Sequence, residues 1–329
     1  LIIGETDIKI NYMIRTAECI TPKHPDKICD RISDAILDAC LEQDPDSRVA
    51  VETMGGHGII SVTGELTTKA YVEIPDIVRS VYNDEDIGVQ VNIVKQSPEI
   101  SQGVDTGGAG DQGIMIGYAC NDNDEMVPQE YYLARKLCKE IYKKYPYDGK
   151  TQITLNEHNQ VRVVASFQNA PAAELGKIIT NFFMPTMYSV LEVHCNPAGD
   201  WDIGGFTADT GLTGRKLAVD NYGPRIPLGG GAFSGKDSSK VDRSAAYAAR
   251  KVAVDYLKRF NAKEVYVTLA YAIGYDQPLQ ATALIDGKET IISDYDLSPK
   301  GIVKLLDLKK PKFSKTAEWG HMGQNFSWE

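Results

Sequence analysis

The sequence has no apolar run of membrane-spanning length, no signal peptide and no excess of basic residues. Its net charge is −10 over 329 residues, which argues against nucleic acid as a general partner. The six cysteines form no C-x-x-C pair, so we expect reduced thiols and no zinc site. These absences predict a cytoplasmic protein with neither a membrane nor a nucleic-acid partner.

Hydrophobic residues make up 43% of the chain, which suffices for a large core, and the length suggests two or three domains. Residues 1–12 read as a leader or an artificial extension, with Met13 as a plausible start. The spacing of apolar residues predicts strands over 48–54, 59–65, 151–155, 161–167, 264–273 and 280–285. It predicts helices over 25–43, 76–82, 131–145, 179–191 and 241–256, and a short helix after Ser298. Strands paired beside long helices indicate an α+β fold with antiparallel sheets, and no internal sequence repeat is visible.

The most informative stretch is the glycine-rich segment Gly229–Asp237, which reads GGGAFSGKD. Three consecutive glycines leave the backbone bare, so its N–H groups can approach a bulky anion. Ser238 or Ser239 is expected to cap the helix that follows, whose apolar residues are Val241, Ala245, Ala248, Val252 and Tyr256. A glycine-rich loop that leads into a helix N-terminus predicts a phosphate site.

Charged residues at the start of this helix support that prediction. Lys236, Lys240 and Arg243 are three or four residues apart and are expected to converge on one anion. Asp242 lies among them, as a carboxylate does when it holds a magnesium ion that bridges phosphates.

Two other interpretations of the segment remain open. Gly230, Gly235 and Lys236 fit the Walker pattern, but Asp237 stands where a P-loop kinase or ATPase needs Ser or Thr. No strand of apolar residues leads into the loop from 221–228 either. A plain glycine-rich turn before a solvated helix is the other alternative.

Further candidate residues lie elsewhere in the chain. His24 and Asp26 stand at a predicted helix N-terminus, where the histidine can donate to a phosphate and the aspartate can serve a metal or the helix dipole. The polar segment 102–113 reads as a mobile loop or a surface connection that enters a strand at Ile114. An exposed Trp201 beside glycines suits stacking on a base.

Four motifs together resemble the S-adenosylmethionine synthetase (methionine adenosyltransferase) family. They are HPDK at 24–27, GAGDQG at 108–113, GLTGRK at 211–216, and GGGAFSGKD with SKVDRSAAYAAR from Gly229. The resemblance runs from about Thr16 to the FSWE end. It implies three similar α/β-sandwich-like domains with pseudo-threefold symmetry and sheets packed with helices outside. The expected division is 13–105, 106–203 and 204–329, with domains discontinuous in space.

The resemblance also implies the reaction. The methionine sulfur attacks C5′ of ATP and displaces triphosphate, which is hydrolysed to pyrophosphate and phosphate. Two Mg²⁺ ions per site and K⁺ are the implied cofactors, with ATP and L-methionine as substrates. The implied assembly is a homodimer with the active site at the subunit interface, or a dimer of dimers.

Site residues follow from the resemblance position by position. The implied catalytic residues, which also bind ATP, are His24, Lys150, Arg215, Lys216 and Lys236. Further ATP contacts are Asp148, Trp201, Asp209 and Ala232. Methionine contacts are Glu65, Gln102, Asp111, Asp209 and Lys240. Metal ligands are Asp26 and Asp242 for Mg²⁺ and Glu52 for K⁺.

The chain departs from the family's pattern at four places. Asp200 stands where the family usually has Arg or Lys, and Leu228 replaces a common His. The loop between Gln102 and Gly110 is shorter than the family's lid, and the region before Asp148 is also abbreviated. The alternative reading is a non-catalytic nucleotide-binding homologue or a regulatory subunit.

Overall fold

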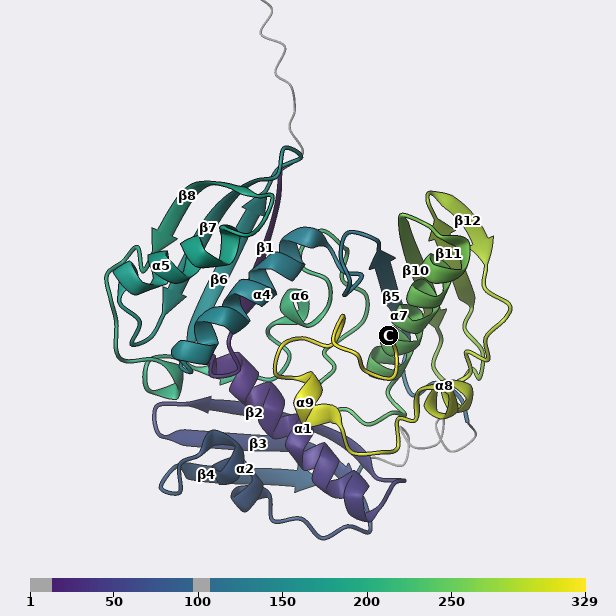
Figure 1. The fold of residues 1–329 in the computed structure, drawn as a ribbon. Helices are drawn as coiled ribbons and strands as arrows, with labels where there is room; N and C mark the ends of the chain where they lie inside the picture. The colour runs from purple at the N-terminus through teal and green to yellow at the C-terminus, as the bar shows by residue number, and fades with distance from the viewer. Residues whose placement is uncertain (1–13, 97–106) are drawn as a thin grey trace, which may run out of the picture.

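The fold repeats one arrangement three times: a long helix, an antiparallel strand pair and a third strand (Figure 1). The computed structural model describes residues 14–96 and 107–329. The first unit runs α1 (Pro25–Gln43), β2 (Arg48–Gly56), β3 (Ile59–Thr67), α2 (Ile74–Tyr82) and β4 (Gly88–Val94). The second runs α4 (Gln129–Lys144), β6 (Gly149–Leu155), β7 (Gln160–Phe167), α5 (Ala172–Phe183) and β8 (Ser189–Cys195). The third runs α7 (Val241–Phe260), β10 (Glu264–Tyr271), β11 (Gln280–Ile285), β12 (Lys288–Ile291) and α8 (Pro299–Leu306).

Each unit gains a fourth strand from a distant part of the chain. The strand β9 (Gly211–Leu212) joins β2, β1 (Arg15–Ile20) joins β6, and β5 (Gly113–Cys120) joins β10. The resulting four-stranded sheets are β4-β3-β2-β9, β8-β7-β6-β1 and β12-β11-β10-β5. The predicted α+β fold with three similar open sheets is therefore confirmed.

The expectation of purely antiparallel sheets is wrong for two of them. Strand β4 runs parallel to β3, and β8 runs parallel to β7. In both cases a helix, α2 or α5, crosses over and brings the chain back in the same direction. In the third sheet β12 follows β11 through a tight turn at Asp286 and Gly287, so that pair stays antiparallel.

The helix expected over 179–191 is also wrong in its second half. Helix α5 ends at Phe183, and strand β8 begins at Ser189. Pro185 follows directly and cannot continue a helix, since its ring removes a backbone donor. Strands β1, β4 and β12 were not expected, although Ala17 and Cys19 are buried on one face of β1 and the sequence of β4 alternates Val, Gln, Val, Asn and Ile.

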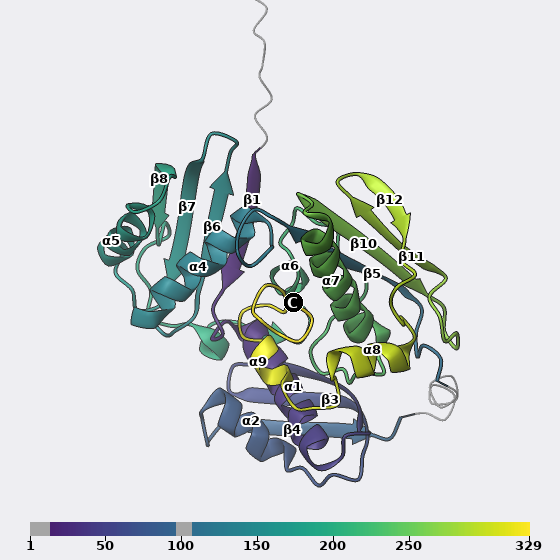
Figure 2. The same ribbon diagram turned by 45° about the vertical axis from the view of Figure 1, so that its right-hand side comes forward.

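The long helices α1, α4 and α7 surround the C-terminal segment in both views (Figures 1 and 2). Helix α1 begins with Pro25 and buries Ile28, Ile32 and Ile36, as its spacing predicts. The C-terminal Trp328 is fully buried, and its ring stacks on Tyr247 of α7 at 3.8 Å between centroids. The tail therefore packs where the three units meet. Short helices α6 (Leu217–Asp220), α9 (Phe313–Thr316) and the 3-10 turn η1 (Gly205–Thr207) complete the fold.

The sheets bury one face and leave apolar side chains on their strands exposed. In β2, Val49, Val51 and Thr53 are buried, whereas Glu52 and Met54 are exposed, as the alternation predicts. Other exposed apolar strand residues are Ile59, Val91, Ile114, Leu191, Val193, Leu284 and Ile291. Among the described residues, no helix is both long and apolar enough to cross a membrane.

Candidate active site

The N-terminus of α1 presents His24 and Asp26. His24 is the N-cap residue, and its Nδ1 accepts a hydrogen bond from the backbone N–H of Asp26 at 3.2 Å. Burial, with Lys216 nearby, lowers the pKa of His24 to about 4. The imidazole is therefore neutral at pH 7, and because Nδ1 is an acceptor, Nε2 carries the proton.

Asp26 joins the HPDK motif to the GLTGRK motif. Its Oδ2 lies 2.5 Å from Lys216 Nζ, and its Oδ1 accepts the backbone N–H of Leu212 at 2.9 Å. Arg215 Nε lies 3.6 Å from the same Oδ1, although the arginine side chain is 54% exposed. Burial opposes ionisation of Asp26, but the bonds from Lys216 and Leu212 outweigh it and hold the pKa of the carboxyl below its usual range.

Asp26 is the first of four aspartates spaced four residues apart on α1, which we call the aspartate ladder: Asp26, Asp30, Asp34 and Asp38. Each accepts backbone N–H groups from the part of the chain beyond residue 210. The donors are Leu212 for Asp26, Gly214 for Asp30, Gly235 for Asp34, and Lys312, Phe313 and Ser314 for Asp38. The sequence analysis missed this ladder, although its spacing of four on a predicted helix was a visible signal.

Lys27 supports the ladder from the core. It is fully buried and binds Asp30 at 3.0 Å and Asp220 at 2.5 Å. Because Asp30 also holds Gly214, the lysine fixes the loop that carries Arg215 and Lys216 relative to His24. Lys27 is thus a positioning residue that the sequence analysis did not identify.

A second group of predicted residues lies beside His24. The Asp148 carboxylate accepts the backbone N–H of Gly205 at 3.0 Å, and burial raises its pKa. Lys150 lies on β6, 3.5 Å from Glu18, and it acts electrostatically on His24 together with Asp209. Trp201 was expected to be exposed; it is half-buried, and a Cβ at Gly204 would lie 2.8 Å from its ring.

The glycine-rich segment lies against an ion pair. Lys236 Nζ is 2.7 Å from Asp242 Oδ2, with both side chains partly buried. A Cβ at Gly231 would lie 2.8 Å from Asp242 Oδ2 and 3.0 Å from Lys236 Nζ. A residue larger than glycine would have to displace the Asp242 carboxylate or the Lys236 ammonium, which explains the glycine here.

Close backbone approaches connect the two groups. A Cβ at Gly214 would lie 2.4 Å from the Cβ of Ala232, so the GLTGRK and GGGA loops touch. Lys236 forms an isolated bridge with Ala50 of β2, whose partner on β3 is Glu65. The structure therefore brings the HPDK, GLTGRK and glycine-rich motifs to one region.

Two expectations about the start of α7 are wrong. The N-cap residue is Lys240, with no side-chain capping bond, so neither Ser238 nor Ser239 caps the helix. Arg243 does not face the predicted phosphate site. It is buried, and its Nη atoms donate to the Asp34 carboxylate at 2.6 and 2.9 Å. Arg243 lies in the first turn of α7, which begins at Val241 as predicted, on the side of the helix that packs against Asp34 of α1.

Other predicted residues are less closely connected. Lys240 Nζ lies 2.5 Å from Asp237 Oδ2. Asp111 and Glu52 are exposed, Glu65 is half-buried, and Gln102 lies outside the described residues. Asp200, which stands where the family usually has a cation, makes local hydrogen bonds. Its Oδ1 accepts one from the Ala172 N–H at the start of α5 and one from Asn196 Nδ2.

Asp26 and Asp242 are the residues implied to bind Mg²⁺. Over residues 14–96 and 107–329 no group of three or more His, Cys, Asp or Glu side chains is arranged to hold a metal ion. At each of the two positions, one protein carboxylate is available to a metal ion, and it is now paired with a lysine, Lys216 or Lys236. That donor set suits Mg²⁺, which uses one or two carboxylates and completes its shell with water and substrate phosphates.

Sequence models of the S-adenosylmethionine synthetase N-terminal, central and C-terminal domains match residues 12–102, 106–201 and 203–329. Among similar proteins are S-adenosylmethionine synthases of Clostridium tetani, at 41% identity over 94% of each chain, and of a Nocardioides species, at 41% over 95% of each. The synthase of Treponema denticola is 42% identical over 97% of this chain and 96% of its own.

The alignments run over 366 to 378 positions, more than the 329 residues here, so the relatives carry segments that this chain lacks. The shortened loop between Gln102 and Gly110 stays a prediction. The resemblance inferred from the four motifs is confirmed over the three matched ranges between residues 12 and 329, and the chain belongs to the S-adenosylmethionine synthetase family.

Proposed function

We propose that S-adenosyl-L-methionine forms where the HPDK, GLTGRK and glycine-rich motifs meet. As a methionine adenosyltransferase, the enzyme uses ATP and L-methionine; the sulfur attacks C5′ of ATP, and triphosphate leaves and is then hydrolysed to pyrophosphate and phosphate. The observation that carries our assignment is a neutral His24 beside Lys216 and the loop that leads to Lys236. The non-catalytic alternative is not favoured, since the similar proteins are synthases.

The cations in this region suit the leaving group. We assign Lys150, Arg215, Lys216 and Lys236 to the triphosphate, whose charge they neutralise as the C5′–O bond breaks. Lys216 and Lys236 are now paired with Asp26 and Asp242, so a bound polyanion would compete with those carboxylates for the ammonium groups. The Nε2–H of His24 is available to donate to an oxygen near the reacting carbon.

The remaining assignments position the two substrates. We propose that Trp201 stacks on adenine and that Asp148, Asp209 and Ala232 contact ATP. For methionine we propose Glu65, Asp111, Asp209 and Lys240 as contacts, with Gln102 from outside the described residues.

The family implies metal dependence. We propose Asp26 and Asp242 as ligands of two Mg²⁺ ions and Glu52 as a ligand of K⁺. Magnesium would screen the phosphate charges while the lysines bind them.

We propose a homodimer with the site at its interface, or a dimer of such dimers. Apolar side chains such as Met54, Ile114 and Leu284 are exposed on the strands, and a partner would bury them. We also propose a cytoplasmic location, which the six free cysteines support. The division at 105/106 and 203/204, with residues 1–12 as an extension, is likewise a proposal.

A product assay with ATP, L-methionine, Mg²⁺ and K⁺ tests the assignment. Wild-type protein should yield S-adenosylmethionine, pyrophosphate and phosphate, and Lys236→Ala should lower kcat/KM by about 100-fold or more. Lys258→Ala is the matched control, since Lys258 is an exposed lysine at the end of α7, the helix that follows the Lys236 loop. Formation of ADP without methionine, or unchanged turnover in Lys236→Ala, would contradict the assignment.

A further inference from the structure

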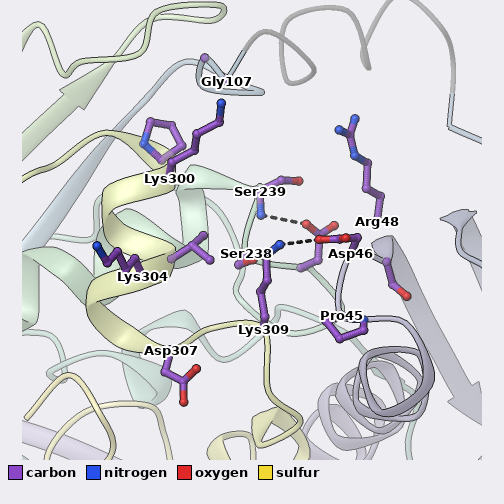
Figure 3. Close-up of a pocket in the computed structure, with 15 residues that line it drawn as sticks. Pro45, Asp46, Arg48, Gly107, Ser238, Ser239, Lys300, Lys304, Asp307 and Lys309 are labelled. Atoms are coloured by element: carbon purple, nitrogen blue, oxygen red, sulfur yellow. Dashed lines mark hydrogen bonds and ion pairs between the residues drawn. The ribbon is translucent and has the colours of Figure 1, made fainter.

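A cavity of about 690 Å³ lies between α8 and the start of β2, outside the site assigned above (Figure 3). Its volume is in the range of small-molecule sites. In Figure 3, Lys300 and Lys304 of α8 form one wall, and Arg48 and Asp46 lie on the opposite one. Ser238 and Ser239 line it between the two walls. None of the described residues assigned to substrates or metals lines this cavity.

The lining is cationic in an acidic protein. Four cations line the cavity: Arg48, Lys300, Lys304 and Lys309. Its three carboxylates are already paired, since Asp46 binds Lys309, Asp237 binds Lys240 and Asp307 binds Lys310. The lining itself therefore carries four cations and three carboxylates, in a chain whose net charge is −10.

Two of these cations, Lys300 and Lys304, form no ion pair with any residue that the structure describes, although Asp296 acts electrostatically on one of them, Lys304. Both are exposed. They are four residues apart on α8; the Lys300 side chain extends toward Gly107, and Lys304 lies one turn further along the helix (Figure 3). Lys300 lies at the first turn of α8, where the helix dipole also favours an anion.

We propose that this cavity binds a polyphosphate anion, either inorganic or carried by a nucleotide. A single phosphate would contact one wall, whereas two or more linked phosphates can contact Lys300 and Lys304 on one side and Arg48 or Lys309 on the other. The hydroxyl groups of Ser238 and Ser239 supply neutral donors between the walls. The ligand would also join α8 of the third unit to the segment that links α1 and β2 of the first.

Equilibrium dialysis with radiolabelled pyrophosphate tests the proposal and does not depend on turnover. Wild-type protein should bind at two classes of site per chain. The double variant Lys300→Gln, Lys304→Gln should lose one class, with affinity reduced by at least about tenfold. Lys236→Ala should lose the other class. Lys258→Gln changes the charge of an exposed lysine elsewhere and should bind as wild type does.

Parallel titrations identify the source of the phosphates. Equal affinity for pyrophosphate and ADP at the Lys300–Lys304 site assigns an inorganic polyphosphate, and tighter ADP binding assigns a nucleotide. Unchanged binding by the double variant would overturn the proposal, whether the wild type shows one class of sites or two. A single class that the double variant loses and Lys236→Ala keeps would support this proposal and count against the active-site assignment instead. Equal displacement by sulfate at matched ionic strength would overturn it too, because the site would then not distinguish polyphosphate. Production of S-adenosylmethionine by the double variant is measured separately, so either proposal can fail alone.

Discussion

Asp26 and Asp34 lie two helical turns apart on the same face of α1, yet their surroundings differ. Asp26 pairs with Lys216, whose side chain is 17% exposed, in the candidate site. Asp34 pairs with Arg243, and both side chains are at most 1% exposed. A flexible lysine can leave its carboxylate for a substrate, whereas a buried arginine held by two bonds cannot without a large cost. Two aspartates with equivalent positions on one helix face thus differ in role: Asp26 lies in the candidate active site, and Asp34 stabilises the core.

Removing the buried carboxylate should have the largest effect on stability. Asp34→Ala leaves the Arg243 guanidinium buried without its counterion, which should lower the free energy of unfolding by about 3 to 5 kcal/mol. Urea unfolding monitored by circular dichroism measures it. The double variant Asp34→Leu, Arg243→Met should regain much of the loss. A cost no greater than that of breaking the exposed Lys143–Glu140 pair would contradict this interpretation.

Breaking the Lys216–Asp26 pair in the candidate site should change the free energy of unfolding little and lower activity strongly. In Lys216→Met, Asp26 keeps the Leu212 N–H, so the free energy of unfolding should fall by only about 1 kcal/mol. The kcat/KM for ATP should fall by about 100-fold, because a cation for the leaving triphosphate is lost. Steady-state kinetics and urea unfolding on the same sample separate the two effects, with Lys143→Met as control. If stability fell as in Asp34→Ala, the contrast between the two aspartates would be lost.

The partly buried histidine at the N-terminus of α1, His24, should make stability depend on pH. The pKa of His24 is about 4 in the folded protein, against an ordinary 6.5, so the unfolded chain takes up a proton first as the pH falls. This should lower the free energy of unfolding by about 2 to 3 kcal/mol between pH 6.5 and 4. His24→Asn keeps a cap for α1 and should remove that part of the slope, whereas His57→Asn, in an exposed turn, should not. Parallel curves for His24→Asn and wild type would show that His24 is not the cause.

The smallest effect is expected at Asp200, whose carboxylate we interpret as structural and not as part of the nucleotide site. Because its carboxylate accepts the Ala172 N–H and an Asn196 bond, Asp200→Ala should cost about 1 kcal/mol of stability and leave the KM for ATP unchanged. A several-fold change in KM with no change in the urea midpoint would instead indicate a role at the nucleotide.

Much of this protein could be predicted from local sequence. The stripe of Ile28, Ile32 and Ile36 fixes α1, and the glycines before Lys236 mark a loop where backbone approaches charge. Each of these features depends only on residues close together in the sequence, so sequence patterns can predict it. The four motifs were specific enough to indicate the family.

Tertiary structure decided what local patterns leave open. Strand β9 joins β2 from more than 150 residues away, and β8 pairs in parallel because α5 turns the chain back. The sequence does not distinguish Lys216 from Arg243 as anion-binding cations; only burial against Asp34 removes Arg243 from the site. The sequence determined which residue types lie at each helix end, and packing between distant segments decided which charges face the core and which remain free to meet a substrate.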